Sequence, residues 1–204
     1  MELFGKSIEY FMQGGWVMFP IAVCSICMWT LIIGRLGVFR ELRRGDIEIG
    51  EAVAAVRGGE VPRATEGIRA RLVRGFLEER SGYPALDRHI LKHCAMRERA
   101  RLDERLATIS ALAAVAPLLG LLGTVIGMIE TFNVISVFGT GNAKAMANGI
   151  SVALITTETG LLVAIPGVFL ASTLWRASAR LKTQLDEDVV ILDRVIRSSA
   201  VREV

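Results

Sequence analysis

Two acidic side chains interrupt otherwise uncharged parts of this 204-residue sequence. Glu158 stands between runs of 13 and 17 uncharged residues, and Glu130 directly follows a run of 24. An ionised acid at the centre of a bilayer costs about 2.5–3.5 kcal/mol even on insertion scales, so such a group is normally protonated, paired or facing a wet interior. Glu158, and with less force Glu130, is therefore a candidate for an ion or proton route. The alternative for both is a neutral, hydrogen-bonded packing residue.

Small residues at helical spacing accompany both acids. They are Gly120, Gly123, Thr124, Gly127 and Thr131 before and beside Glu130, and Gly149, Ala153, Thr156, Gly160, Ala164 and Gly167 around Glu158. At 100° per residue each set gathers on one side of a helix. In lipid such stripes let helices approach closely, so we expect these two helices to pack against each other. Tight packing with no further role is the simplest interpretation of most of the glycines.

The loop between the two helices sets the register of the antiparallel pair. If it turns symmetrically near Gly141, three pairs lie at equal depth: Thr124 with Thr157, Gly123 with Glu158, and Glu130 with Ser151. Glu158 would then lie deep in the apolar layer and Glu130 nearer the outside. The two hydroxyls of the first pair would face each other at one level.

Enzymatic chemistry fits the sequence poorly. Both histidines, His89 and His93, lie in a charged segment away from the apolar runs, which leaves no base for an intramembrane serine nucleophile. The runs contain no Asp, and their two Glu lie apart, so an aspartyl dyad is also excluded. Two histidines one helical turn apart without carboxylate partners are weak metal ligands. We expect no enzyme activity, no cofactor and no metal site.

The apolar runs predict three membrane-spanning helices. Hydrophobic residues make up 52% of the chain, and a helix needs about 20 apolar residues to cross a hydrocarbon core of about 30 Å. The three runs predict spans at residues 15–34, 106–135 and 148–175. The chain is thus expected to be an all-α membrane protein embedded in a lipid bilayer.

Basic residues predict the orientation of these spans. Residues 35–105 hold 16 Lys and Arg and residues 176–204 hold 6, which leaves only Lys6 and Lys144 elsewhere. By the positive-inside rule those two stretches are cytoplasmic, and residues 1–14 and 136–147 are periplasmic. The basic residues therefore report topology, the net charge of +3 says little about nucleic acid, and we expect no nucleic-acid partner.

The predicted cytoplasmic stretches read as helices. A short helix ends at Gly58-Gly59, a second runs from Pro62 to near Ser81, and a third runs from Ala85 into the second span without a turn signal. Beyond Arg176, one apolar stripe continues the third span: Leu181, Leu185, Val189, Leu192 and Ile196. The second and third spans should therefore extend into a cytoplasmic helical bundle.

Two segments resemble the second and third spans of the ExbB/TolQ/MotA proton-channel family, and specifically of its ExbB-like branch: APLLGLLGTVIGMIETF at 116–132 and GISVALITTETGLLVAIPG at 149–167. The segment GGWVMFPIAVCSICMWTLIIGRL at 14–36 resembles that branch's first span. The resemblance implies a homopentamer in the bacterial inner membrane, with a central pore that holds single-span ExbD- or TolR-like helices. It also implies that protons cross through an aspartate of that partner and energise a TonB-like protein.

The resemblance places the family's pore-lining threonines at Thr124 and Thr157, with departures elsewhere. Relatives carry a glutamate where this chain has Val152, and Glu158 lies about 240° round the helix from that position. A Glu-Arg-Leu at the end of the first span is Gly34-Arg35-Leu36 here. Three functions follow: a motor subunit for TonB-dependent import, a TolQ-like subunit for envelope maintenance, or a non-conducting scaffold assembled through the small-residue stripes.

Overall fold

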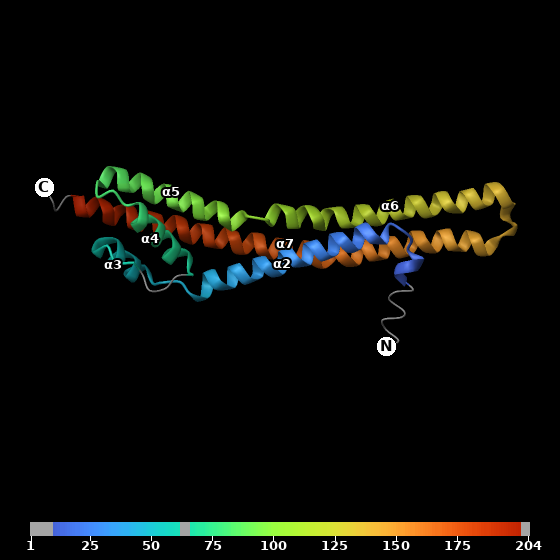
Figure 1. Ribbon diagram of the computed structural model, residues 1–204, viewed down its shortest axis with the longest axis horizontal. Coiled ribbons are helices and arrows are strands. Elements are labelled where there is room, and N and C mark those ends of the chain that lie inside the picture. The colour runs from blue at the N-terminus through green and yellow to red at the C-terminus, as the bar shows by residue number, and fades with distance from the viewer. Residues whose placement is uncertain (1–9, 62–65, 201–204) are drawn as a thin grey trace. The chain divides into compact units, whose positions relative to one another are not determined.

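The computed structural model describes residues 10–61 and 66–200, and the regular structure within them is helical (Figure 1). The helices are α2 (Met18–Arg44), α3 (Ile49–Gly58), α4 (Ile68–Glu79), α5 (Pro84–Asp103), α6 (Leu106–Phe138), the 3-10 turn η1 (Gly139–Gly141) and α7 (Ala143–Ala200). Three stretches are long and apolar enough to cross a membrane: α2, the α5–α6 stretch and α7. The predicted fold class, an all-α protein with three membrane-spanning helices, is confirmed.

The described chain divides into two compact units. Unit 1 holds residues 10–33 and 107–172, and unit 2 holds residues 34–61, 66–106 and 173–200. Helices α2 and α7 each contribute residues to both. The membrane borders and the orientation of the spans stay predictions.

Helix α2 packs in unit 1 against both other helices. Cys24 of α2 is buried with Ala116 of α6 and Ala164 of α7, and its thiol donates a hydrogen bond of 3.4 Å to the carbonyl of Leu112. Small side chains at these three positions allow the helices to approach closely, because packing drives helix association in lipid.

The helices of unit 2 form a bundle around apolar side chains. Four members of the predicted C-terminal stripe are buried and Val189 is half-buried, so the stripe is confirmed as the core face of α7. Four ion pairs join α4 and α5 to this helix: Arg69 with Asp188 at 2.8 Å, Arg88 with Asp193 at 2.6 Å, Arg99 with Asp186 at 3.0 Å, and Asp103 with Lys182. The pair at Asp188 matters most, because this carboxylate is 2% exposed and would be left buried and unpaired without its arginine.

Helix α4 begins later than the sequence predicts. The prediction began this helix at Pro62, which lies outside the described residues, whereas the helix starts at Ile68. The reason is a cap from far along the chain: Asp46 accepts a hydrogen bond of 2.9 Å from the backbone N–H of Arg69, and a Cβ at Gly67 would overlap Asp46. A carboxylate at a helix N-terminus satisfies N–H groups that have no partner within the helix.

The predicted uninterrupted helix from Ala85 into the second span is wrong in one detail. Helix α5 ends at Asp103, and Arg105 adopts a left-handed φ of 63° before α6 begins at Leu106. Arg35 of α2 donates hydrogen bonds of 3.1 Å and 2.6 Å to the carbonyls of Arg101 and Leu102. One buried side chain thus satisfies carbonyls that lose their helical partners where α5 stops.

We predict that Arg105→Gly leaves the melting temperature of the purified protein unchanged or raises it, whereas Arg105→Ile lowers it. The left-handed conformation costs a residue with a Cβ about 1–2 kcal/mol, and a β-branched residue fits it worst. Ala100→Gly, an exposed position inside α5, is the control and should lower stability by about 1 kcal/mol. Equal losses in the two glycine variants would contradict the left-handed break.

Candidate ion-pathway site

Glycines bring the backbones of α6 and α7 into direct contact (Figure 1). A Cβ at Gly120 would lie 2.9 Å from the carbonyl oxygen of Thr156, and one at Gly160 would lie 2.8 Å from that of Ala116. At Gly127 it would lie 2.5 Å from the carbonyl of Gly149. These distances are shorter than real Cβ contacts, so only glycine allows this approach. We call this contact line between α6 and α7 the glycine seam.

The two remaining glycines chosen from the sequence also face neighbouring helices. A Cβ at Gly123 would overlap the side chain of Thr156 in the glycine seam. At Gly167 it would lie 2.5 Å from the sulfur of Met28 and 3.2 Å from the Cβ of Ala113, so this glycine receives α2 as well as α6.

The register of the seam differs slightly from that predicted for a symmetric loop. Gly123 faces Thr156, not Glu158, and Thr157 faces Gly120, one turn of α6 away from Thr124. The first difference is two residues along α7, about 3 Å of helix rise, and the second is four residues along α6, about 6 Å. The loop is asymmetric, because η1 extends α6 by a 3-10 turn while α7 begins after a single residue, Asn142.

Two further threonines lie inside the seam. Thr156 is fully buried and its hydroxyl donates to the carbonyls of Val152 at 2.9 Å and Ala153 at 3.0 Å. Thr131, also buried, donates to the carbonyl of Gly127 at 2.9 Å. In the sequence, the signal for this packing role of Thr156 and Thr131 is their position in the small-residue stripes.

Thr124 and Thr157 lie half-buried at the edge of the seam. The Thr124 hydroxyl donates to the carbonyl of Leu121 at 2.6 Å, and the Thr157 hydroxyl reaches the carbonyls of Ala153 at 3.1 Å and Gly120 at 3.4 Å. Both hydroxyls therefore have local backbone partners and keep oxygen lone pairs available to accept a further hydrogen bond.

The two threonines turn away from α2. Thr124 is about 140° round α6 from Leu119, which packs against the cluster containing Cys24. Thr157 is about 160° round α7 from Ile155, which lies against Gly14 just before α2. Among the described residues, the edge of the seam that carries both hydroxyls thus lies on the side away from α2.

Glu158 follows Thr157 and faces outward from the described chain. It is exposed, and it makes no hydrogen bond or ion pair with any described residue. Its helical neighbours are large, exposed and apolar: Leu154, Leu161, Leu162 and Ile165. A carboxyl on such a face within a membrane needs a protein or water partner, because lipid alone leaves it unsatisfied.

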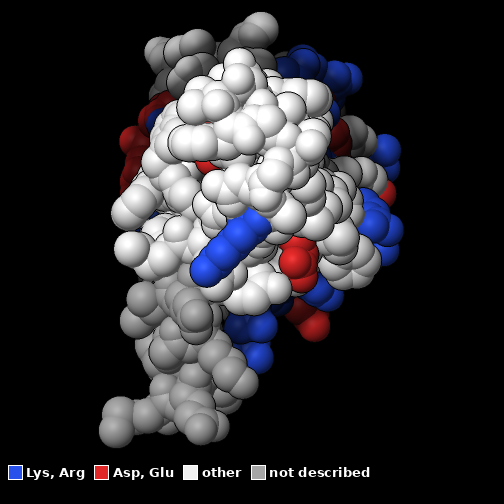
Figure 2. All heavy atoms as spheres, turned by 90° about the vertical axis from the view of Figure 1, so that its right-hand side faces the viewer, with Lys and Arg blue, Asp and Glu red and all other residues white. Residues whose placement is uncertain are grey.

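Glu130 and Val152 occupy different surroundings from Glu158. Glu130 is exposed on α6, about 240° round the helix from Thr124, and has no partner among the described residues. Val152 is buried beside Gly15, 3.7 Å from a Cβ placed there. A glutamate at the Val152 position would face the chain leading into α2, whereas Glu158 faces away from it. The near surface of unit 1 around the α6–α7 loop is mostly uncharged (Figure 2).

Comparison with known proteins defines the class. Residues 64–187 match the model of the MotA/TolQ/ExbB proton channel family. The chain is 34% identical over 171 residues to the putative biopolymer transport protein ExbB-like 1 of Synechocystis, which covers 78% of this chain and 67% of the relative. The chain belongs to the MotA/TolQ/ExbB proton channel family, in its ExbB-like branch. This is a family of membrane transport subunits and is not known as an enzyme family.

Other relatives carry the same kind of name. The chain is 30% identical over 178 residues to a putative ExbB homolog of Methanothermobacter thermautotrophicus, covering 81% of this chain and 61% of the relative. It is 27% identical over 184 residues to the biopolymer transport protein ExbB of Pseudomonas putida, covering 84% and 56%. The chain thus spans little more than half the length of the last of these.

We predict that Gly160→Ala lowers the melting temperature of the detergent-solubilised protein. The added methyl group meets backbone atoms of α6, which cannot move aside, and overpacking of this kind costs about 1–3 kcal/mol. Gly50→Ala in α3 is the matched control: its Cβ meets nothing within 4 Å, and alanine favours a helix by up to about 1 kcal/mol. If Gly160→Ala and Gly50→Ala gave the same results in thermal unfolding and size-exclusion chromatography, the close approach of α6 and α7 at the glycine seam would be contradicted.

Proposed function

We propose that this chain is the proton-channel subunit of a bacterial inner-membrane motor that uses the proton-motive force to energise TonB-dependent transport across the outer membrane. The observation that carries the proposal is the edge of the glycine seam, where Thr124 and Thr157 present half-buried hydroxyls on the side away from α2. Glu158 lies about 100° round α7 from Thr157, and its carboxyl has no partner among the described residues. Relatives named as biopolymer transport protein ExbB support this choice over a TolQ-like role.

The proposed assembly is a pentamer around a central pore. Its N-terminus is periplasmic and its C-terminus cytoplasmic, as the distribution of Lys and Arg favours. The threonine edges of the five copies would face single helices of an ExbD- or TolR-like partner, and a TonB-like protein would receive the motion. Support comes from the position of both hydroxyls on the side of the seam away from α2.

Each threonine hydroxyl suits a proton-exchanging partner. While it donates to a backbone carbonyl, its oxygen can accept a hydrogen bond from a protonated carboxyl group. When that carboxyl loses its proton, the hydroxyl can rotate and donate to the carboxylate instead. Thr124 and Thr157 would therefore stabilise both protonation states of an acid on the partner helix. Glu158, one residue further along α7, would take up or release the proton.

We predict that replacing both Thr124 and Thr157 by Val lowers proton-gradient-dependent uptake without lowering membrane abundance. Valine keeps the volume and removes the hydrogen bond, and the loss of one costs about 0.5–1.5 kcal/mol. Thr30→Val is the control, because its exposed hydroxyl makes the same local bond, to Ile26 at 2.8 Å, on α2. Uptake of a TonB-dependent substrate is measured at equal protein level and oligomer size. Full uptake in the double variant would remove both hydroxyls from the proton route.

Substitutions of Glu158 distinguish a proton-driven motor subunit from a non-conducting scaffold. If it exchanges protons, Glu158→Gln should assemble with the partner yet lose gradient-dependent activity, whereas Glu158→Asp should retain part of it. If it only packs, Gln is the milder change, because it preserves shape and most hydrogen bonding, and Asp is the more harmful. The order of uptake rates in the two variants, at equal abundance in the membrane, decides. A Gln variant as active as the wild type would contradict the proton role.

A further inference from the structure

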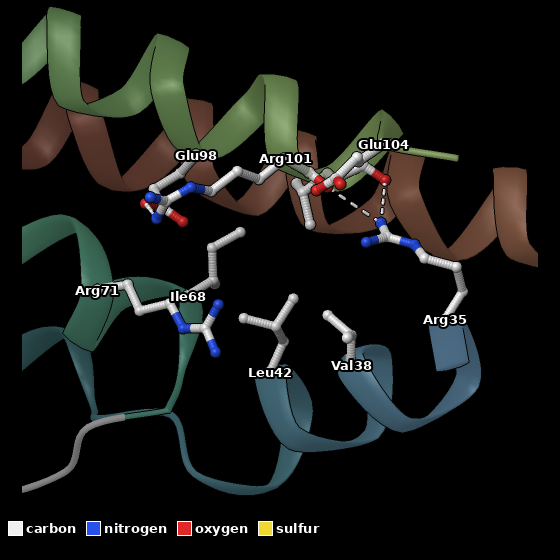
Figure 3. Close-up of a pocket in the computed structure, with 9 residues that line it drawn as sticks. Arg35, Val38, Leu42, Ile68, Arg71, Glu98, Arg101 and Glu104 are labelled. Carbon is white, nitrogen blue, oxygen red and sulfur yellow. Dashed lines mark hydrogen bonds and ion pairs between the residues drawn. The ribbon is translucent and has the colours of Figure 1, made fainter. Parts of the chain in front are cut away.

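Unit 2 contains a pocket of about 190 Å³ bounded by the second half of α2, the start of α4 and the end of α5 (Figure 3). Its lining combines apolar and charged residues: Arg35, Val38, Leu42, Ile68, Arg71, Glu98, Arg101, Leu102 and Glu104. Val38, Leu42 and Ile68 form an apolar floor, and charged groups surround it. An apolar floor surrounded by charged groups suits a small polar group that carries an apolar stem.

The charges around the pocket leave a surplus of arginine. Glu98 is neutralised by Arg101 at 2.6 Å, and Glu104 contacts Arg105, which is outside the lining, at 3.5 Å. Arg71 has no ion pair or hydrogen bond with any described residue. Its guanidinium group points into the pocket from α4, as Figure 3 shows.

Arg35 supplies the second charge, from the opposite wall. It is only 6% exposed, and although Nη2 bonds two carbonyls of α5, its Nε is buried without an acceptor among the described residues. Its guanidinium group also lies 4.9 Å from the ring of Phe39. The carboxylates of Glu104 and Asp103 act on this cation through space, but neither accepts a hydrogen bond from it. A buried cation with an unused donor is costly, so a further anion with an acceptor oxygen would be favourable here.

The pocket borders the predicted inner end of the first span. That span is expected to end at residue 34, so Arg35 lies where phospholipid headgroups begin, with the basic segment 35–105 on the same side. Guanidinium forks match the oxygens of a phosphate, and basic pockets between helices on the cytoplasmic side suit anionic headgroups.

We propose that this pocket binds the phosphate group of an anionic ligand through Arg71 and Arg35, with an anionic phospholipid as the source at the membrane surface. The phosphate lies between the two guanidinium groups, and the glycerol part lies along the apolar floor. A bound headgroup adds an acceptor near Arg35, the residue that also caps α5. The site is independent of the threonine edge and of proton transport.

Arg71→Gln tests the proposal, because Arg71 makes no ion pair or hydrogen bond with any described residue. Arg74→Gln is the matched control on the same helix, with the same loss of charge outside the pocket. Purified protein in detergent is titrated with phosphatidylglycerol, with phosphatidylcholine and with soluble glycerol phosphate. Thermal shift reports binding, and native mass spectrometry counts the retained lipid.

We expect phosphatidylglycerol to stabilise the wild type and Arg74→Gln at equal concentration, and to require an about fivefold higher concentration in Arg71→Gln. Arg71→Lys, which keeps the charge without the fork, should lie between. An equal shift with glycerol phosphate would identify a free phosphate ester as the ligand of the same site. Equal responses in Arg71→Gln and Arg74→Gln, or no response to any phosphate, would overturn the site. If Arg71→Gln does not fold, the comparison of Arg71→Lys with the wild type decides in the same way.

Discussion

The direct contact between the backbones of α6 and α7 is the constraint on which the candidate site depends. At Gly120, Gly127 and Gly160 a single methyl group would meet main-chain atoms of the other helix. This proximity brings the Thr157 hydroxyl within 3.4 Å of a carbonyl on α6 and leaves Thr124 one turn away. In lipid, where apolar exclusion does not hold helices together, such packing must supply much of the association energy. Because glycine has no side chain, the two helices come close enough to fix where the threonine hydroxyls lie.

Patterns that repeat along one helix could be predicted from the sequence. The three spans, the small-residue stripes and the apolar stripe from Leu181 to Ile196 each follow from the length or period of one segment, and the structure contains all of them as helices or packed faces. The outward direction of Glu158, away from the seam, likewise follows from its rotation relative to Gly160.

Features set by distant residues could not be predicted in this way. The start of α4 depends on Asp46, which lies far before it in the sequence, and the end of α5 depends on Arg35. No glycine or proline marks the break at Arg105, because the left-handed turn is carried by an arginine whose preceding carbonyls are satisfied from α2. The register of the seam shifted because the loop contains a 3-10 turn on one side only. For the helix ends the missing information was a tertiary contact, and for the register of the seam it was the local conformation of the loop.

Helix α7 runs without a break from Ala143 to Ala200, whereas α5 and α6 are separated at Arg105. Helix α7 is a rod of hydrogen-bonded turns in which one bond is missing at Pro166, which has no backbone N–H. A rod of this kind resists torsion, because twisting one turn strains the bonds of the next. The route through α6 and α5 instead contains a residue whose dihedral angles can absorb rotation. Torsional compliance is therefore expected at the α5–α6 junction and not along α7.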